Sequence, residues 1–141
     1  MKKQIVFWLL AIMITICFVS CGDSDSEYIT SINNNSTFEI IVHFPDDSII
    51  VCLPKQETII EKGWAGSVKK FSCMSPYIFK NNFAQIAIDE GNKILTKNIS
   101  DDNNWNCYGD KDWSLIMVGS YYSKITTTFT INDEDIESIE Q

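Results

Sequence analysis

Residues 121–131 form the stretch YYSKITTTFTI, whose residues alternate between the two faces of an extended chain. One face would carry Tyr121, Ile125, Thr127, Phe129 and Ile131. The other face would carry Tyr122, Lys124, Thr126, Thr128 and Thr130. A repeat of two is typical of a half-buried β-strand, and β-branched and aromatic residues suit its pleated surface. This stretch therefore predicts a long strand with one face in the core.

The same alternation recurs upstream, between segments rich in turn-forming residues. Residues 37–44 predict a second strand, with the apolar residues facing inward and His43 facing outward. Shorter candidate strands occupy residues 48–53, 57–61, 68–73, 83–88, 93–97 and 113–118. Turn-forming residues lie between them, as at 45–47 and 89–92. Residues 132–141 fit either one helical turn or a frayed acidic tail.

Strands at this spacing, with no helical segments between them, indicate an all-β protein. We expect an antiparallel β-sandwich, immunoglobulin-like or similar, with about seven or eight strands. A small β-barrel is the alternative architecture.

Composition indicates a single globular domain and argues against a nucleic-acid surface. The chain has 141 residues, of which 45% are hydrophobic and 21% charged. Its 11 basic residues are all lysine and face 19 acidic residues, so the formal net charge is −8. Binding to a phosphate backbone needs a basic stripe, and this balance predicts no nucleic-acid partner.

The N-terminus has the three-part layout of a secretory signal. Lys2 and Lys3 precede an uncharged run at 5–19, which small residues and the acidic stretch 23–27 follow. A helix rises about 1.5 Å per residue, so this run would span roughly 22 Å of the ~30 Å hydrocarbon core. The run is therefore too short to cross a membrane well.

The sequence Phe18-Val19-Ser20-Cys21 resembles a bacterial lipobox, although Phe18 stands where leucine is usual. The resemblance implies cleavage before Cys21, acylation of its sulfur, and a lipid that holds the protein on a membrane. It divides the chain into a signal peptide at 1–20, an acidic tether at 21–27 and one all-β domain at 28–141.

The acidic tether also resembles an export signal for surface lipoproteins in one Gram-negative phylum. The expected location is the cell envelope, in the outer membrane, with display on the surface or on the periplasmic face both open.

Three cysteines remain in the body after cleavage: Cys52, Cys73 and Cys107. An exported protein with three cysteines is expected to form one disulfide and keep one free thiol, and the sequence does not choose among the pairings. Three reduced thiols are the alternative, with Cys52 and Cys73 as small buried hydrophobic residues. Cys107 lies in the polar segment 103–109, so we expect it to be the most accessible.

No constellation of residues indicates catalysis, and we predict a protein that is not an enzyme and holds no cofactor. The single histidine, His43, is expected on the outer face of a strand beside Glu39 and Ile41, as an exposed residue and not as part of a catalytic triad. Residues 101–112 begin like a calcium loop, but Cys107 replaces its glycine and Trp113 its bidentate glutamate. We therefore expect no metal site.

Trp105, Tyr108 and Trp113 gather around this polar segment and could stack on the faces of sugars. Closure of the end of the sandwich is the alternative role for these rings. The main functional hypothesis is thus a membrane-anchored, non-enzymatic interaction or structural module of the envelope, whose partner would be an envelope protein. A glycan-binding accessory lipoprotein is the second hypothesis, and a hydrolase with acids in unrecognised positions is the third.

Overall fold

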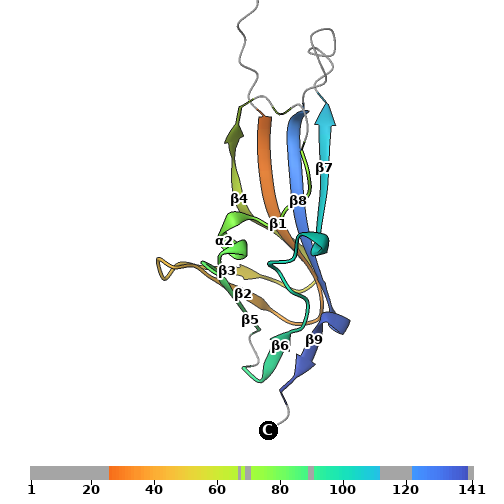
Figure 1. The fold of residues 1–141 in the computed structure, drawn as a ribbon. Helices are drawn as coiled ribbons and strands as arrows, with labels where there is room; N and C mark the ends of the chain where they lie inside the picture. Colours follow the sequence, from red (N-terminus) through yellow and green to blue (C-terminus); the bar gives the residue numbers. More distant parts are fainter. Residues whose placement is uncertain (1–25, 67, 69–70, 89–90, 112–121, 140–141) are drawn as a thin grey trace, which may run out of the picture.

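The computed structural model describes residues 26–66, 68, 71–88, 91–111 and 122–139. Within these ranges the chain is mostly β-strand, which confirms the predicted all-β class (Figure 1). The elements, in chain order, are β1 (Ser26–Asn35), β2 (Ile40–His43), β3 (Ile49–Cys52), β4 (Gln56–Ala65), α2 (Tyr77–Lys80), β5 (Gln85–Ile88), β6 (Lys93–Leu95), η1 (Asp102–Asn104), β7 (Trp105–Lys111), β8 (Tyr122–Asn132), η3 (Asp133–Asp135) and β9 (Ile136–Ser138).

The strands form a sandwich-like arrangement of three open sheets, and none of them closes on itself among the described strands. The largest has the order β4-β1-β8-β7, the second has the order β3-β2-β5, and β6 pairs with β9. Every pair is antiparallel except β1 and β8, which run parallel at the centre of the large sheet. The predicted antiparallel sandwich is confirmed apart from this one parallel pair. The sequence could not reveal the exception, because a repeat of two is the same in both kinds of pairing.

The core lies between the inner faces of the two larger sheets. The four-stranded sheet contributes Ile32, Trp105, Phe129 and Ile131, and the three-stranded sheet contributes Ile40, Val42, Cys52 and Ile88. Phe79 of α2 and Ala84 complete this buried cluster. The predicted alternation in β8 places Phe129 and Ile131 correctly in the core.

The opposite face of β8 is less exposed than the sequence suggests. Thr126 and Thr128 were expected to face outward, toward solvent. Only 8% of Thr126 and 7% of Thr128 is exposed. β8 lies between β1 and β7, and the Oγ1 of Thr128 is 3.0 Å from the Oγ of Ser31 on β1. Neighbouring strands therefore shield this face.

The structure also changes the boundary between tether and domain. Ser26 and Glu27, assigned to the acidic tether, are the first residues of β1. The Glu27 carboxylate lies 2.6 Å from the Lys62 ammonium of β4, and the Ser26 hydroxyl donates to the Tyr122 carbonyl. The folded domain thus includes residues 26 and 27.

The other departures concern polar or short segments. β1 and β7 were not predicted as strands. Within 132–141, where one helical turn or a frayed tail was expected, the 3-10 turn η3 does form, but residues 136–138 then form β9. Of the candidate strand at 68–73, Val68 makes only an isolated bridge to Tyr122. The candidate strand at 113–118 lies outside the described residues.

The long strands make the molecule elongated, with two distinct ends (Figure 1). β1 starts, and β4 and β7 finish, at one end, whereas β6 and β9 lie at the other. Phe71 and Tyr122 pack edge to face at 4.6 Å over Gly109, where a Cβ would lie within 2.8 Å of both rings. Gly109 therefore allows the segment around Phe71 to lie close against the long sheet.

Candidate functional site

Trp105 was a candidate for ligand stacking, and the structure shows that this prediction is wrong. Its side chain is 3% exposed and packs between Phe79 and Phe129, with ring centroids 5.8 and 5.2 Å away. The indole N–H donates to the Ile99 carbonyl at 2.8 Å. Trp105 is a core residue because it starts β7 on the inner face of the sheet.

Tyr108 lies on the opposite face of β7, since residues three apart in a strand point to opposite sides. It is 57% exposed. Around it, a shallow pocket of about 340 Å³ is lined by Ile29, Glu57, Ile59, Lys124 and Thr126. Trp113 lies outside the described residues, so of the three aromatic candidates the structure places only Tyr108 at a surface.

The cysteines of the body form one disulfide, between Cys73 and Cys107, which are 34 residues apart in sequence. Cys107 is therefore not the accessible thiol that its polar neighbours suggested, because it faces inward on β7, beneath the segment that carries Cys73. Cys52 is unpaired and fully buried on β3, and burial raises the pKa of its thiol. The proposed lipid site, Cys21, lies outside the described residues.

The polar loop before β7 uses its acidic and amide groups within the fold. The Asp102 carboxylate accepts from the Ser75 backbone N–H at 2.7 Å and lies 3.2 Å from the Lys80 ammonium. The hydrogen bond from the Ser75 N–H is the larger of two effects that hold the pKa of the Asp102 carboxyl below its ordinary value, and the hydrogen bond from Lys80 is the other. Asn104 donates to the Asn98 carbonyl. Asp102 and Asn104, two residues of the segment that resembled a calcium loop, thus serve as internal hydrogen-bond partners. The described residues contain no cluster of three metal-ligating side chains.

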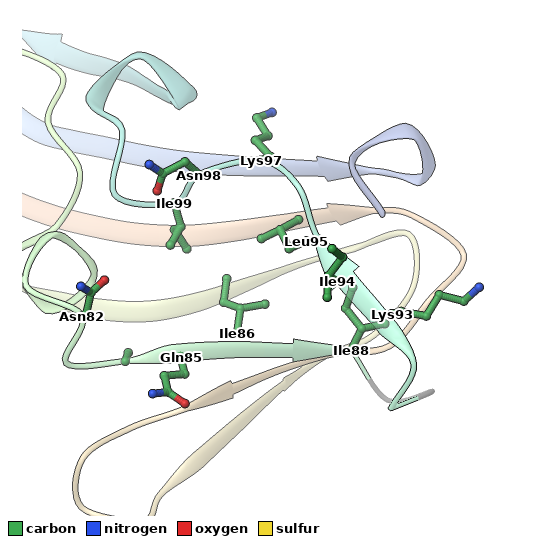
Figure 2. A pocket seen from close by; sticks show the side chains of 11 residues that line it. Asn82, Gln85, Ile86, Ile88, Lys93, Ile94, Leu95, Lys97, Asn98 and Ile99 are labelled. Atoms are coloured by element: carbon green, nitrogen blue, oxygen red, sulfur yellow. The ribbon is translucent and has the colours of Figure 1, made fainter. Parts of the chain in front are cut away.

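A concave surface lies between β5 and the segment 93–99, and we call it the β5–β6 groove (Figure 2). Its volume is about 640 Å³, within the range of ligand pockets. Its lining consists of Asn82, Ala84, Gln85, Ile86, Ile88, Lys93, Ile94, Leu95, Lys97, Asn98 and Ile99. Neither histidine nor an acidic residue is among them.

The floor of the groove is apolar and part of the sandwich core. Ile86, Leu95 and Ile99 are half-buried and pack against the buried cluster. Figure 2 shows these side chains directed between the two walls, with Asn82 at one end of the groove, whereas the side chains of Lys93 and Lys97 extend away from it. Gln85 turns away from the groove in the same view. A ligand here would meet aliphatic side chains along its length and the Asn82 amide at one end.

Both lysines of the lining are held by hydrogen bonds. The Lys93 ammonium donates to the Ser138 hydroxyl at 3.0 Å and lies 5.0 Å from the centre of the Phe38 ring. The Lys97 ammonium donates to the Thr130 carbonyl at 2.8 Å and lies 3.9 Å from the Asp135 carboxylate. Lys93 has no carboxylate partner among the residues that the structure describes.

The groove was not found from the sequence, because its residues come from both sides of the turn at 89–92 and carry no reactive groups. The only signal was the run of apolar residues on either side of this turn, which we interpreted as two ordinary strands. Comparison of the chain with protein-family models, with curated proteins and with solved structures finds no match.

Proposed function

We propose that this protein is a lipid-anchored lipoprotein of the bacterial envelope that acts by binding a partner in the β5–β6 groove, without catalysis. The lipobox-like sequence before Cys21 supports the anchor. The groove supports binding, because it is a concave surface of about 640 Å³ with an apolar floor.

The observation that carries this proposal is the position of the groove relative to the anchor. Between Cys21 and Ser26 the chain makes five residue steps, which can span at most about 18 Å. Acylated Cys21 would therefore keep the start of β1 close to the lipid surface. β1 has ten residues and rises roughly 33 Å, and β5 and β6 lie toward the other end of the molecule (Figure 1). This geometry would present the groove away from the membrane.

The side chains of the groove also suit binding better than catalysis. General acid–base or nucleophilic chemistry needs a titratable group close to the substrate. The lining offers two lysines, each already donating to an oxygen of the protein, and three amides. No helix among the described residues is long and apolar enough to cross a bilayer.

Glycan binding around Tyr108 is the second candidate, and the exposure of this ring on the outer face of the long sheet favours it. Lys124, Thr126 and Glu57 supply polar groups around the ring. If this surface binds sugars, Tyr108→Ala will abolish retention on a glycan array, whereas Tyr77→Ala, at another exposed tyrosine, will retain it. Equal signals from both variants would exclude the Tyr108 surface.

The anchor is tested by mass spectrometry of the N-terminal peptide from protein purified with its native signal. We expect an acylated Cys21 at the mature N-terminus and a protein that fractionates with membranes. Cys21→Ser should remain unprocessed, and Cys17→Ser, within the apolar run, should be processed as the wild type is. An unmodified Cys21 in the mature peptide would overturn the proposal. Surface biotinylation of intact cells would then distinguish the outer surface from the periplasmic face.

A further inference from the structure

The shallow pocket around Tyr108, which we call the Tyr108 trough, lies on the outer face of the four-stranded sheet. Residues directly opposite each other on paired strands point to the same side of a sheet. Tyr108 is opposite Thr126 of β8, and Thr126 is opposite Ile29 of β1, so these side chains form one row across the sheet. Ile59 of β4 lies in the next row, opposite Ser31. The lining of the trough consists of Ile29, Glu57, Ile59, Tyr108, Lys124 and Thr126.

The trough has an exposed ring on one side and an aliphatic side chain on the other. Tyr108 on β7 and Ile59 on β4 are 57% and 54% exposed. β1 and β8 lie between these two strands, as Figure 1 shows, and their Ile29 and Thr126 form a less exposed floor. A tyrosine ring combines a large apolar face with a polar edge. A sugar needs both, because its C–H groups stack on a ring face while its hydroxyls need hydrogen-bonding partners.

Polar groups lie at both ends of the trough. The Glu57 carboxylate accepts from the Ser31 hydroxyl at 2.6 Å, so one acceptor is oriented before a ligand binds. Lys124 lies beyond the row of Tyr108, toward the start of β8, and makes no salt bridge with any residue that the structure describes. From Lys124 to the residue of β8 opposite Ser31, the strand rises by four residues, or about 13 Å. A ligand that contacts both ends is therefore elongated.

We propose that the Tyr108 trough binds a linear, uncharged oligosaccharide that lies along the strands, with one sugar ring stacked on Tyr108. This inference rests on the second candidate function, because it names the ligand of the same surface. The Glu57 carboxylate and the Lys124 ammonium balance each other, so a charged glycan that is attracted at one end is repelled at the other. The formal net charge of the whole chain, −8, further disfavours a polyanion.

The inference is tested by isothermal titration calorimetry on the full chain, held in micelles of a detergent that has no sugar headgroup. The probes are uncharged linear hexasaccharides of glucose, mannose and xylose, the shorter members of each series, and hexagalacturonate as the charged counterpart. We expect one uncharged series to bind, with an affinity that rises with chain length and levels off once the trough is filled. Its monosaccharide and hexagalacturonate should bind about tenfold more weakly or worse.

Two matched pairs of variants locate the ligand. Tyr108→Phe keeps the ring and should bind within about twofold of the wild type, whereas Tyr108→Leu should weaken binding about tenfold. Glu57→Ala should weaken binding about fivefold, because it removes a hydrogen-bond acceptor. Glu61→Ala should have no effect, since this other exposed acidic residue of β4 accepts from the Tyr28 hydroxyl and is not part of the lining.

Three results would overturn the inference: no binding of any uncharged hexasaccharide, equal binding of hexagalacturonate, or an affinity independent of chain length. If a charged or single-ring sugar binds and Tyr108→Leu abolishes that binding, the inference fails while the second candidate function stands. If no sugar of any kind is bound or retained, both fail. The β5–β6 groove and the anchor are unaffected by either outcome, because neither involves the outer face of this sheet.

Discussion

At the scale of single residues, Asn34 shows most clearly how a polar side chain can hold the sandwich together. It is fully buried at the end of β1. Its amide N–H groups donate to the carbonyls of Phe38 and Cys52, both at 2.8 Å, and its carbonyl accepts from the backbone and hydroxyl of Ser36. Asn34 thus joins the four-stranded sheet to β3 and to the chain that leads into β2.

Replacement of Asn34 by alanine should therefore destabilise the fold strongly. The change would leave buried carbonyls without donors, at a cost of about 1–3 kcal/mol for each group. We expect Asn34→Ala to lower the free energy of unfolding by about 3 kcal/mol in urea denaturation. Asn106→Ala, at an exposed position of β7, should stay within about 0.5 kcal/mol of the wild type. Equal stability of the two variants would contradict the assigned role.

Single residues also show why local sequence was a poor guide to burial. Trp105 and Cys107 lie among asparagines, which suggested an exposed loop. The strand β7 instead turns both residues inward, and its exposed positions take the polar neighbours Asn106 and Tyr108. Because the segment is polar as a whole, we interpreted it as a loop and overlooked the alternation of inward and outward residues within it.

At the scale of elements, the sequence found the strands with strong apolar alternation and missed those without it. β2, β3, β4, β5, β6 and β8 all overlap predicted strands. β1, with the sequence SEYITSINNN, has only two aliphatic residues, yet it pairs on both sides with long strands. Its strand conformation comes from these partners, because β-propensity depends strongly on context.

The disulfide between Cys73 and Cys107 fastens an extended segment to β7, and its removal should be costly. By the loop-closure estimate, a cross-link over 34 residues contributes about 3–4 kcal/mol. We expect the double variant Cys73→Ser/Cys107→Ser to lose most of this stability in urea denaturation. Dithiothreitol should lower the stability of the wild type by a similar amount and leave the double variant unchanged. A wild type that is insensitive to reductant would contradict this.

At the scale of the whole molecule, the elongated shape separates the end that would face the membrane from the groove. Trp64 belongs to the first of these ends, where it is paired in register with Glu27 at the start of β1 and is 68% exposed. Under the proposed anchor, this end lies within about 18 Å of the acylated residue. Tryptophan favours the interface between lipid and water.

We therefore expect Trp64 to contact lipid headgroups in the anchored protein. In vesicles that contain brominated lipids, the fluorescence of the acylated protein should be quenched, and Trp64→Phe should remove a large part of that quenching. Trp105, which is buried in the core, and Trp113 are present in both proteins, so the difference between the two proteins reports Trp64. The same quenching in both proteins would place this end away from the bilayer, even if Cys21 is acylated.

The sequence by itself determined the all-β class, because alternation with a period of two is a local property of the chain. The signal-like N-terminus and the candidate lipid site were also read locally, and they remain predictions. The tertiary structure decided the parallel pairing of β1 with β8, the partner of Cys107, the burial of Trp105 and the existence of the β5–β6 groove. Each of these depends on residues distant in sequence, or on how strands pack, and a local pattern carries no information about such contacts.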